Sequence, residues 1–224
     1  LMRFSRGIPP LGCGGTTERD NGNGSLMRIL PIVFYLQSVY GADFCETDEA
    51  FEIIHNVSAL THAHKRSQIA CGIYVSVASA LMDGTDPEIA VETDIHRAVD
   101  HYRSHPGFSR ELHHYERLTR KDFSELDEAE IRSTGYVVDT LEAAIWCLLR
   151  TDSFRDCVLK AVNLGGDTDT VAAVAGGLAG LYYGYESIPD DWLSVIAKRD
   201  YVESLCNQLY EAFGKSTTRN YADI

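Results

Sequence analysis

The sequence lacks any apolar run of roughly 18 residues, the length that a helix needs to cross a bilayer. It holds six cysteines but no C-x-x-C pair, and no segment near Leu1 has the pattern of a targeting peptide. Scattered cysteines of this kind are typical of a reducing compartment, where most of them serve as small core residues. We therefore expect a cytoplasmic protein without a membrane partner.

Basic residues are also scarce. Lys and Arg number 20 against 33 Asp and Glu, which gives a formal net charge of −13. This balance argues against an extended nucleic-acid surface, which requires clustered cations. A small anionic ligand held by backbone N–H groups remains compatible with it. With 224 residues and 45% hydrophobic content, we expect one domain over residues 1–224 with a substantial core.

Alternating, strand-like patterns are nearly absent, and 136–138 is the one short β-like piece. Helical patterns dominate, no period of 20 to 50 residues recurs, and 104–127 is interpreted as mixed loop and short helix. The predicted fold class is all-α, a compact multi-helix domain. We expect helices over 25–36, 47–56, 64–82, 87–102, 139–149, 153–163, 168–183, 192–197 and 201–213.

The densest polar motif is Gly165-Gly166-Asp167-Thr168-Asp169-Thr170. Helix capping alone would account for the acidic residues, because both would favour the positive end of a helix. The two preceding glycines, which allow close backbone approach, and the third oxygen of Thr170 favour a hard cation such as Mg²⁺ or Mn²⁺. An EF-hand is excluded by the spacing. The Ala- and Gly-rich run at 171–180 predicts a helix packed closely against others.

A second motif is the glycine-rich stretch from Gly14 to Ser25. Glycines in a loop that opens a helix direct several N–H groups toward one point, as phosphate-binding loops do. The stretch is neither a Walker loop nor a dinucleotide-binding fingerprint. A solvated connection is the alternative interpretation. Asn23 or Ser25 is the expected N-cap of the following helix.

Two further motifs, at 61–64 and 133–136, suggest contacts with a ligand. His62 and His64 lie at a helix start without a Cys or Glu at zinc spacing, so a capping or ligand-contacting histidine is favoured over a metal ligand. Tyr136 follows a glycine turn in Ser133-Thr134-Gly135-Tyr136. Its ring is either part of the core or a stacking platform for a base or sugar.

Four segments together resemble the ADP-ribosylglycohydrolase family, whose bacterial type is the dinitrogen reductase-activating glycohydrolase. They are Asp20 to Arg28, Leu60-Thr61-His62, Gly135 to Leu141 and Gly165 to Thr170, in the family's order, and the similarity covers about residues 12–192. The resemblance implies an all-α fold with a binuclear Mg²⁺ or Mn²⁺ site. It also implies hydrolysis of the bond between C1″ of ADP-ribose and an acceptor, with an ADP-ribosylated protein or a small ADP-ribose compound as partner.

By this resemblance Asp167, Asp169 and Thr170 would be metal ligands. Asp20 would be a catalytic carboxylate near the reacting ribose. Asn23-Gly24-Ser25 would hold the diphosphate or ribose, while His62 and Tyr136 would line the cleft. A metal could bind the ribose diol and a water, and offset charge at the anomeric centre.

The family's Gly-Asp-x-x-Gly and Thr-Asp-Asp-Thr motifs, which the resemblance assigns to the other metal ligands, do not occur in this sequence. We therefore expect a chain that lacks the N-terminal metal-binding part, with half of the metal shell. The leading hypothesis is an ADP-ribosyl hydrolase that needs this segment. A catalytically impaired ADP-ribose or nucleotide-binding module is the second hypothesis, and a structural helical domain with Asp167 and Asp169 as caps is the third.

Overall fold

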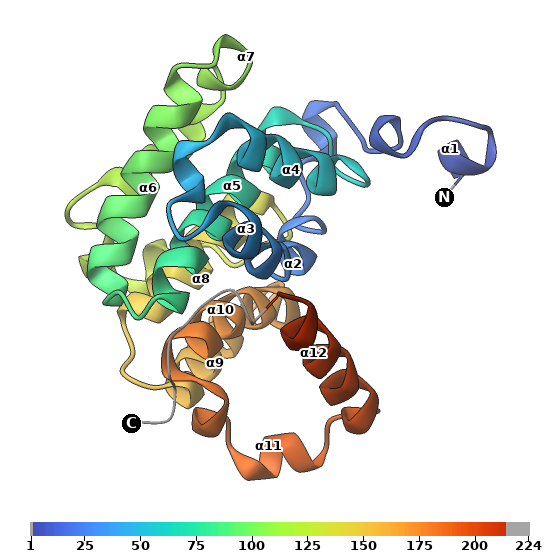
Figure 1. Ribbon diagram of the computed structural model, residues 1–224. Coiled ribbons are helices and arrows are strands. Elements are labelled where there is room, and N and C mark those ends of the chain that lie inside the picture. The colour runs from blue at the N-terminus through green and yellow to red at the C-terminus, as the bar shows by residue number, and fades with distance from the viewer. Residues whose placement is uncertain (1, 214–224) are drawn as a thin grey trace.

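The computed structural model describes residues 2–213, which are largely helical and pack as a bundle with a projecting arm (Figure 1). The predicted all-α fold class is confirmed. The α-helices are α1 (Met2–Ser5), α2 (Leu26–Ile29), α3 (Ile32–Tyr40), α4 (Asp48–Ala59), α5 (Lys65–Met82), α6 (Pro87–Arg103), α7 (Pro106–Ser109), α8 (Val137–Leu149), α9 (Phe154–Asn163), α10 (Thr168–Tyr183), α11 (Asp190–Ser194) and α12 (Arg199–Phe213).

Short 3₁₀ turns connect these helices. They are η1 (Pro10–Gly12), η2 (Glu18–Asp20), η3 (Phe44–Glu46), η4 (Leu112–Thr119), η5 (Phe123–Glu125), η6 (Glu128–Glu130) and η7 (Tyr185–Ser187). Within residues 2–213 the structure contains no β-strand, only two isolated bridges. The β-like piece at 136–138 is therefore one bridging residue, Tyr136, followed directly by the first turn of α8.

Helix α5 forms the centre of the bundle, and nearly all its side chains are buried. Helices α4, α6, α8 and α10 all pack against it, and in Figure 1 α4 and α6 flank it while α10 lies below. Gly72 allows α6 to approach closely, because a methyl group there would lie 1.8 Å from the Tyr102 hydroxyl oxygen. That buried hydroxyl is 2.9 Å from Nε2 of His55, so the contact is specific as well as tight.

The small-residue helix α10 packs closely against its neighbours, as the Ala and Gly run predicts. A methyl group at Gly177 would lie 2.7 Å from the Tyr74 hydroxyl oxygen of α5. That hydroxyl donates a 2.9 Å hydrogen bond to the carbonyl of Val174. Short side chains therefore bring the backbone of α10 against α5, and this fixes the position of the acidic first turn of α10.

Two of the predicted helices, 25–36 and 192–197, differ most from the observed ones. The expected helix at 25–36 is divided at Leu30–Pro31 into α2 and α3, because Pro31 has no N–H to continue the helical hydrogen bonds. The expected helix at 192–197 instead spans Asp190–Ser194, directly after Pro189, which sits at its N-cap. Ser25 does occupy the N-cap position of α2, but its side chain makes no capping hydrogen bond.

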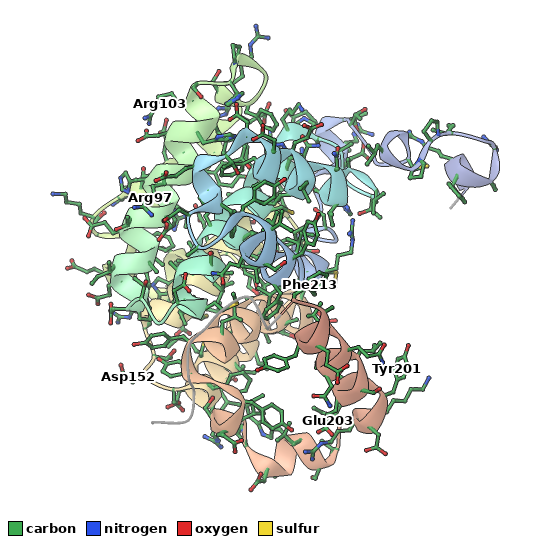
Figure 2. The ribbon with its side chains drawn as sticks, viewed as in Figure 1. Arg97, Arg103, Asp152, Tyr201, Glu203 and Phe213 are labelled. Carbon is green, nitrogen blue, oxygen red and sulfur yellow. The ribbon has the colours of Figure 1, made fainter. Side chains whose placement is uncertain are left out.

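Helices α11 and α12 form the arm that extends below α9 and α10 (Figure 1). Figure 2 shows Phe213, at the end of α12, where the arm returns to the bundle. Its ring packs edge-on against Tyr35 of α3, with centroids 5.7 Å apart. Tyr201, near the start of α12, lies on the side away from the bundle.

The cysteines agree with the prediction of small core residues. All six are free, and four of them, Cys45, Cys71, Cys147 and Cys157, are buried. Among residues 2–213, no helix combines the length and the apolar character that a transmembrane span requires.

Replacing Gly72 with Ala should destabilise the bundle by about 1–3 kcal/mol, because the buried Tyr102 ring has no room to move. Gly180→Ala in α10 is the matched control. Its methyl group would meet Phe154 at an ordinary 3.8 Å, so helix propensity should leave it neutral or stabilised by up to about 1 kcal/mol. Urea unfolding measures both, and equal effects would contradict the close approach of α5 and α6.

Glu142 on α8 gives the fold a predictable pH dependence. Burial raises the pKa of its carboxyl to about 7, although Arg117 lies 3.6 Å away. The unfolded chain loses this proton at lower pH, so the Glu142 contribution to stability falls as pH rises from about 4.5 to about 7.

Glu142→Gln should therefore gain stability relative to the parent across that pH range, by at most about 3 kcal/mol. The difference should then stay level above pH 7. Unfolding free energies of both proteins at several pH values measure this, and a difference that is constant with pH would contradict the buried, protonated carboxyl.

Candidate functional site

The glycine-rich loop before α2 is held against the segment that follows α4. The backbone N–H of Gly15 donates to the carbonyl of Thr61 at 3.1 Å, and the N–H of Ala63 donates to the carbonyl of Gly15 at 2.8 Å. These bonds form the parallel bridge between Gly15 and His62. The preceding position, Gly14, also requires glycine, because a methyl group there would lie 2.2 Å from the carbonyl of Ala59.

The same loop is also held against the start of α8. The N–H of Asn23 donates to the carbonyl of Gly135 at 3.0 Å, and the N–H of Val137 donates to the carbonyl of Asn21 at 3.0 Å. Gly22 and Tyr136 face each other in this antiparallel bridge. The loop is therefore fixed at both ends by backbone pairing and is an ordered element of the fold.

The side chain of Asn23 joins the loop to α8 and α10. Its amide donates to Oδ2 of Asp167 at 2.6 Å and to Oγ1 of Thr140 at 2.9 Å. The other oxygen of Asp167, Oδ1, accepts a 3.2 Å hydrogen bond from Thr170. The Asp167 carboxylate thus accepts hydrogen bonds from the distant Asn23 and from the nearby Thr170.

The two glycines before Asp167 determine the backbone conformation that leads to it. Gly165 and Gly166 both have positive φ, at 78° and 69°, a region that favours glycine. A side chain at Gly166 would also lie 1.9 Å from the carbonyl of Ser133. Asp167 precedes α10, while Asp169 lies exposed in the first turn of the helix. Both acids stand at the N-terminal end of α10.

Asp20 lies at the other side of the loop. Its Oδ2 accepts hydrogen bonds from the Thr17 N–H at 2.8 Å and from the Thr17 hydroxyl at 2.6 Å, which forms a capping box around η2. These hydrogen bonds, the hydroxyl first, lower the pKa of Asp20. The residue is therefore a carboxylate at neutral pH, suited to stabilising positive charge and not to donating a proton.

His62 lies against the loop between Asp20 and Asn23. A methyl group at Gly24 would lie 2.7 Å from its Cε1 atom. The Nδ1 atom is 2.9 Å from the hydroxyl of Thr61, which accepts a 2.7 Å hydrogen bond from Arg28. Burial, and then the charge of Arg28, lower the pKa of His62. A neutral imidazole, able to accept as well as donate, therefore faces the loop.

Gly24 and Ser25 differ in their exposure. Gly24 is half-buried next to His62, whereas Ser25 is completely buried. The Ser25 hydroxyl accepts from the thiol of Cys71 on α5, at 3.5 Å. Of the expected ligand-contacting residues, Ser25 thus lies beneath the loop, and the others lie along its surface or at its contacts with α8 and α10.

Arg66 is a residue of this site that the sequence patterns did not single out. Its guanidinium is buried and makes two hydrogen bonds with the carboxylate of Glu18, at 2.9 and 3.0 Å. A third bond, at 2.9 Å, reaches Glu111. The same group lies 5.9 Å from the ring centroid of Tyr136. Arg66 therefore fixes the start of the loop and one side of the Tyr136 ring.

The ligand atoms at the start of α10 are of the type that a hard divalent cation binds. They are fewer than the coordination number of such a cation requires. Asp167, Asp169 and Thr170 offer two carboxylates and a hydroxyl, which are ligands that Mg²⁺ and Mn²⁺ accept. Octahedral Mg²⁺ requires about six oxygens. The described residues therefore fit one side of such a site, and water, a ligand diol or further protein groups would have to complete it.

The four segments that carry the family resemblance thus contact one another, and comparisons with known proteins support that resemblance. The family model for ADP-ribosylglycohydrolase matches residues 1–219. The chain is 32% identical over 197 residues to "ADP-ribosylarginine hydrolase Tri1" of Serratia proteamaculans, covering 88% of this chain and 48% of that protein. It is 31% identical over 194 residues to "ADP-ribosyl-[dinitrogen reductase] glycohydrolase" of Rhodospirillum rubrum, covering 84% and 57%.

A solved structure described as "ADP-ribosylglycohydrolase-related protein complex" superposes with a TM-score of 0.72 and 28% identity, over 94% of this chain and 65% of that one. The chain spans about half the length of the curated relatives that it matches. Sequence and fold agree over nearly the whole described chain, and the chain therefore belongs to the ADP-ribosylglycohydrolase family.

Proposed function

We propose that this chain is the helical bulk of a hydrolase that cleaves the bond between C1″ of ADP-ribose and its acceptor. The observation that carries the proposal is the convergence of Asn23 and Thr170 on Asp167. This arrangement orients a carboxylate from both sides at the positive end of α10. Two relatives carry names of enzymes that act on ADP-ribosylated arginine or dinitrogen reductase, which supports an ADP-ribosylated protein or a smaller ADP-ribosyl compound as substrate.

In this proposal Asp167, Asp169 and Thr170 hold Mg²⁺ or Mn²⁺, two ions in the complete site. When bound, such metals supply positive charge to the ribose diol and to a water. Asn23 orients Asp167 and does not ligate the metal itself. Orienting partners of this kind hold a ligand in the geometry that the metal needs.

The loop and its neighbours are proposed to receive ADP-ribose. Gly24, which has no side chain, allows the ligand to approach the backbone, and the buried Ser25 supports the loop from below. His62 and Tyr136 are proposed to contact this ligand, with the Arg66 guanidinium 5.9 Å from the Tyr136 ring centroid. Asp20 stays ionised and is placed to offset the positive charge that develops at C1″ in an oxocarbenium-like transition state. The six free cysteines support a cytoplasmic location.

A second candidate function is a non-catalytic ADP-ribose-binding module. It is favoured by the small number of metal-binding groups at the start of α10, which are two carboxylates and one hydroxyl. Incubation of the chain with ADP-ribosylarginine and Mg²⁺ or Mn²⁺, with release of ADP-ribose as the readout, separates the two. Turnover supports the hydrolase. ADP-ribose binding by calorimetry without turnover supports the binding module, and the absence of both would contradict each proposal.

Asp20→Asn should lower turnover on the order of 10²-fold or more, since it removes a charge that acts on the transition state. ADP-ribose affinity should change little, because the amide keeps the shape of the side chain. Steady-state kinetics and calorimetry measure the two effects. An equal loss in both quantities would argue that Asp20 only shapes the loop.

Asn23→Ala should weaken the metal-dependent binding of ADP-ribose by about 10–100-fold, because Asp167 loses the donor that orients it. Asn163→Ala is the matched control, because Asn163 is exposed and its amide donates to the carbonyl of Leu159 within α9. Calorimetry at fixed Mg²⁺ gives the affinities, and thermal unfolding checks the folding of each variant. Equal affinity in both variants would refute the orienting role.

A further inference from the structure

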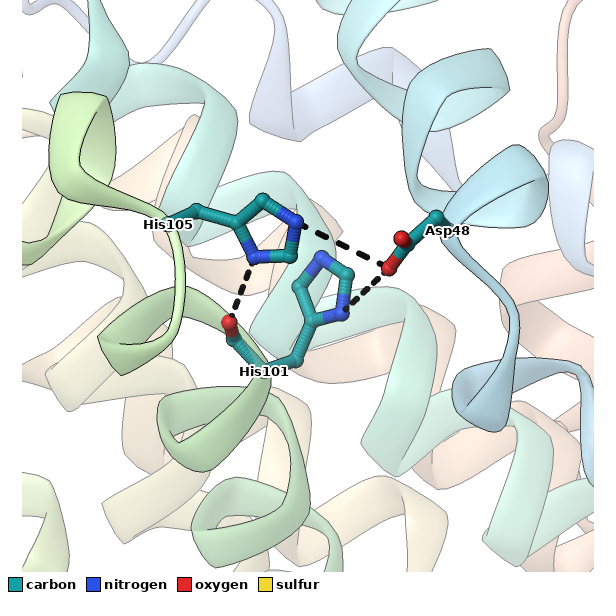
Figure 3. A group of neighbouring side chains, drawn as sticks. All are labelled: Asp48, His101 and His105. Atoms are coloured by element: carbon teal, nitrogen blue, oxygen red, sulfur yellow. Dashed lines mark hydrogen bonds and ion pairs between the residues drawn. The ribbon is translucent and has the colours of Figure 1, made fainter.

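A group of side chains lies apart from the candidate site, where the start of α4 meets the end of α6 (Figure 3). Asp48 is the first residue of α4, His101 lies in the last turn of α6, and His105 follows that helix. One ligand atom from each of the three lies within 4.8 Å of the others. His62 of the candidate site follows the opposite end of α4. That end is about 18 Å from Asp48, at 1.5 Å per residue.

The distances suit a shared metal ion better than hydrogen bonds. Oδ1 of Asp48 is 3.5 Å from Nδ1 of His101 and 3.7 Å from Nε2 of His105. Charge-assisted hydrogen bonds between such atoms are about 2.7–2.9 Å long. Ligand atoms around tetrahedral zinc, with bonds of about 2.0–2.2 Å, are instead about 3.3–3.6 Å apart. Both observed distances lie close to that spacing.

The hydrogen bonding of His105 leaves its Nε2 atom available to bind a metal. Its Nδ1 lies 2.8 Å from the carbonyl oxygen of His101, to which it can only donate (Figure 3). In the neutral ring, Nε2 therefore carries a lone pair directed toward the Asp48 carboxylate. Histidines that ligate metals in proteins use this arrangement, in which the other ring N–H donates to a carbonyl.

The ring of His101 is held in place by aromatic packing. It stacks on Phe51 of α4, with centroids 3.8 Å apart and an interplanar angle of 14°. Tyr102 meets it edge-on at 5.2 Å. Only 13% of the His101 side chain is exposed, compared with 75% of Asp48. The group thus combines one rigid buried ligand with an open side on which water could occupy a further position.

The group carries one carboxylate between the ends of two helices. It lies at the C-terminal end of α6, where the helix dipole stabilises positive charge, and at the N-terminal end of α4, where the dipole stabilises the Asp48 carboxylate. In a second group of potential ligands, Glu18, His64 and Glu111, the carboxylates are already paired. The buried guanidinium of Arg66 already bonds to both of its carboxylates, so the cation position there is occupied by the protein itself.

We propose that Asp48, His101 and His105 form a binding site for a transition-metal dication, with Zn²⁺ as its best fit. Two imidazoles and one carboxylate are the donor set that zinc accepts, whereas Mg²⁺ and Ca²⁺ prefer oxygen ligands alone. The ion joins α4 to the end of α6. It is separate from the oxygen ligands at α10 and does not depend on the proposed hydrolase activity.

Calorimetric titration of the full chain with Zn²⁺, in the presence of excess Mg²⁺, tests this site. The parent should bind Zn²⁺ at a site that is weakened at least about tenfold in both Asp48→Asn and His105→Gln, since each loses one of three ligands. Asp48 is largely exposed and His105 is partly exposed, so these variants should fold, and far-ultraviolet circular dichroism checks this. Zn²⁺ should raise the unfolding temperature of the parent more than that of either variant.

Two control variants match the charge and the residue type. Glu49→Gln removes the neighbouring exposed acid from the first turn of α4, and His96→Gln removes an exposed histidine from α6. Both should bind Zn²⁺ like the parent. The proposal is overturned if the parent does not bind Zn²⁺, if Asp48→Asn and His105→Gln bind it with parental affinity, or if the controls lose affinity to the same extent.

Discussion

The hydrogen bond from Asn23 to Asp167 is the interaction on which the candidate site depends. It spans 144 positions of sequence and is 2.6 Å long. The donor is 9% exposed and also bonds to Thr140, so its loss would leave two buried or half-buried oxygens without their partner, at a cost of about 1–3 kcal/mol. Because one amide binds residues of α8 and α10, the loop cannot shift without moving both helices relative to their acceptors. The geometry of the acidic turn is thereby coupled to the loop that is proposed to receive ADP-ribose.

Arg66 fixes the opposite end of the same loop through a different kind of interaction. A buried guanidinium is costly unless its hydrogen bonds are satisfied, and here Glu18 and Glu111 satisfy them from two separate segments. Tyr115 adds a hydrogen bond to the Arg66 carbonyl, which ties η4 to the first turn of α5. The loop is therefore bounded by an ion-pair network at Glu18 and by the Asn23 amide near α2. Between these anchors lie Asp20 and Gly22.

Much of the helical order was predictable from sequence, because periodic apolar residues, caps and glycine stops are local signals. The break at Leu30–Pro31 was missed because the residues on either side keep helical angles, and only the missing proline N–H divides the helix. The motifs also identified the segments that meet at the site. The partners of those motifs were not predictable in the same way. Nothing in the local pattern around Arg66 indicates a buried arginine, and Ser25 lies in a promising loop yet turns its hydroxyl to Cys71. The burial of these two side chains depends on which elements pack together. The periodicity of the sequence carries no information about that packing.

The two groups of potential metal ligands, at the start of α10 and at the end of α6, differ in the type of ligand atom that they offer. The start of α10 offers only oxygens, from Asp167, Asp169 and Thr170, whereas the end of α6 offers two imidazoles with one carboxylate. Hard cations with high coordination numbers favour the first set, and zinc, which accepts four ligands, favours the second. Zinc needs one ligand beyond Asp48, His101 and His105, which a single water can provide, but Mg²⁺ at α10 needs about three. The second group is therefore nearer to a complete site by its own residues, while the first depends on ligands from substrate, solvent or other protein segments. Helix α4 begins at Asp48 and leads to His62 just after its end, so an ion at its start would restrain the element that positions His62.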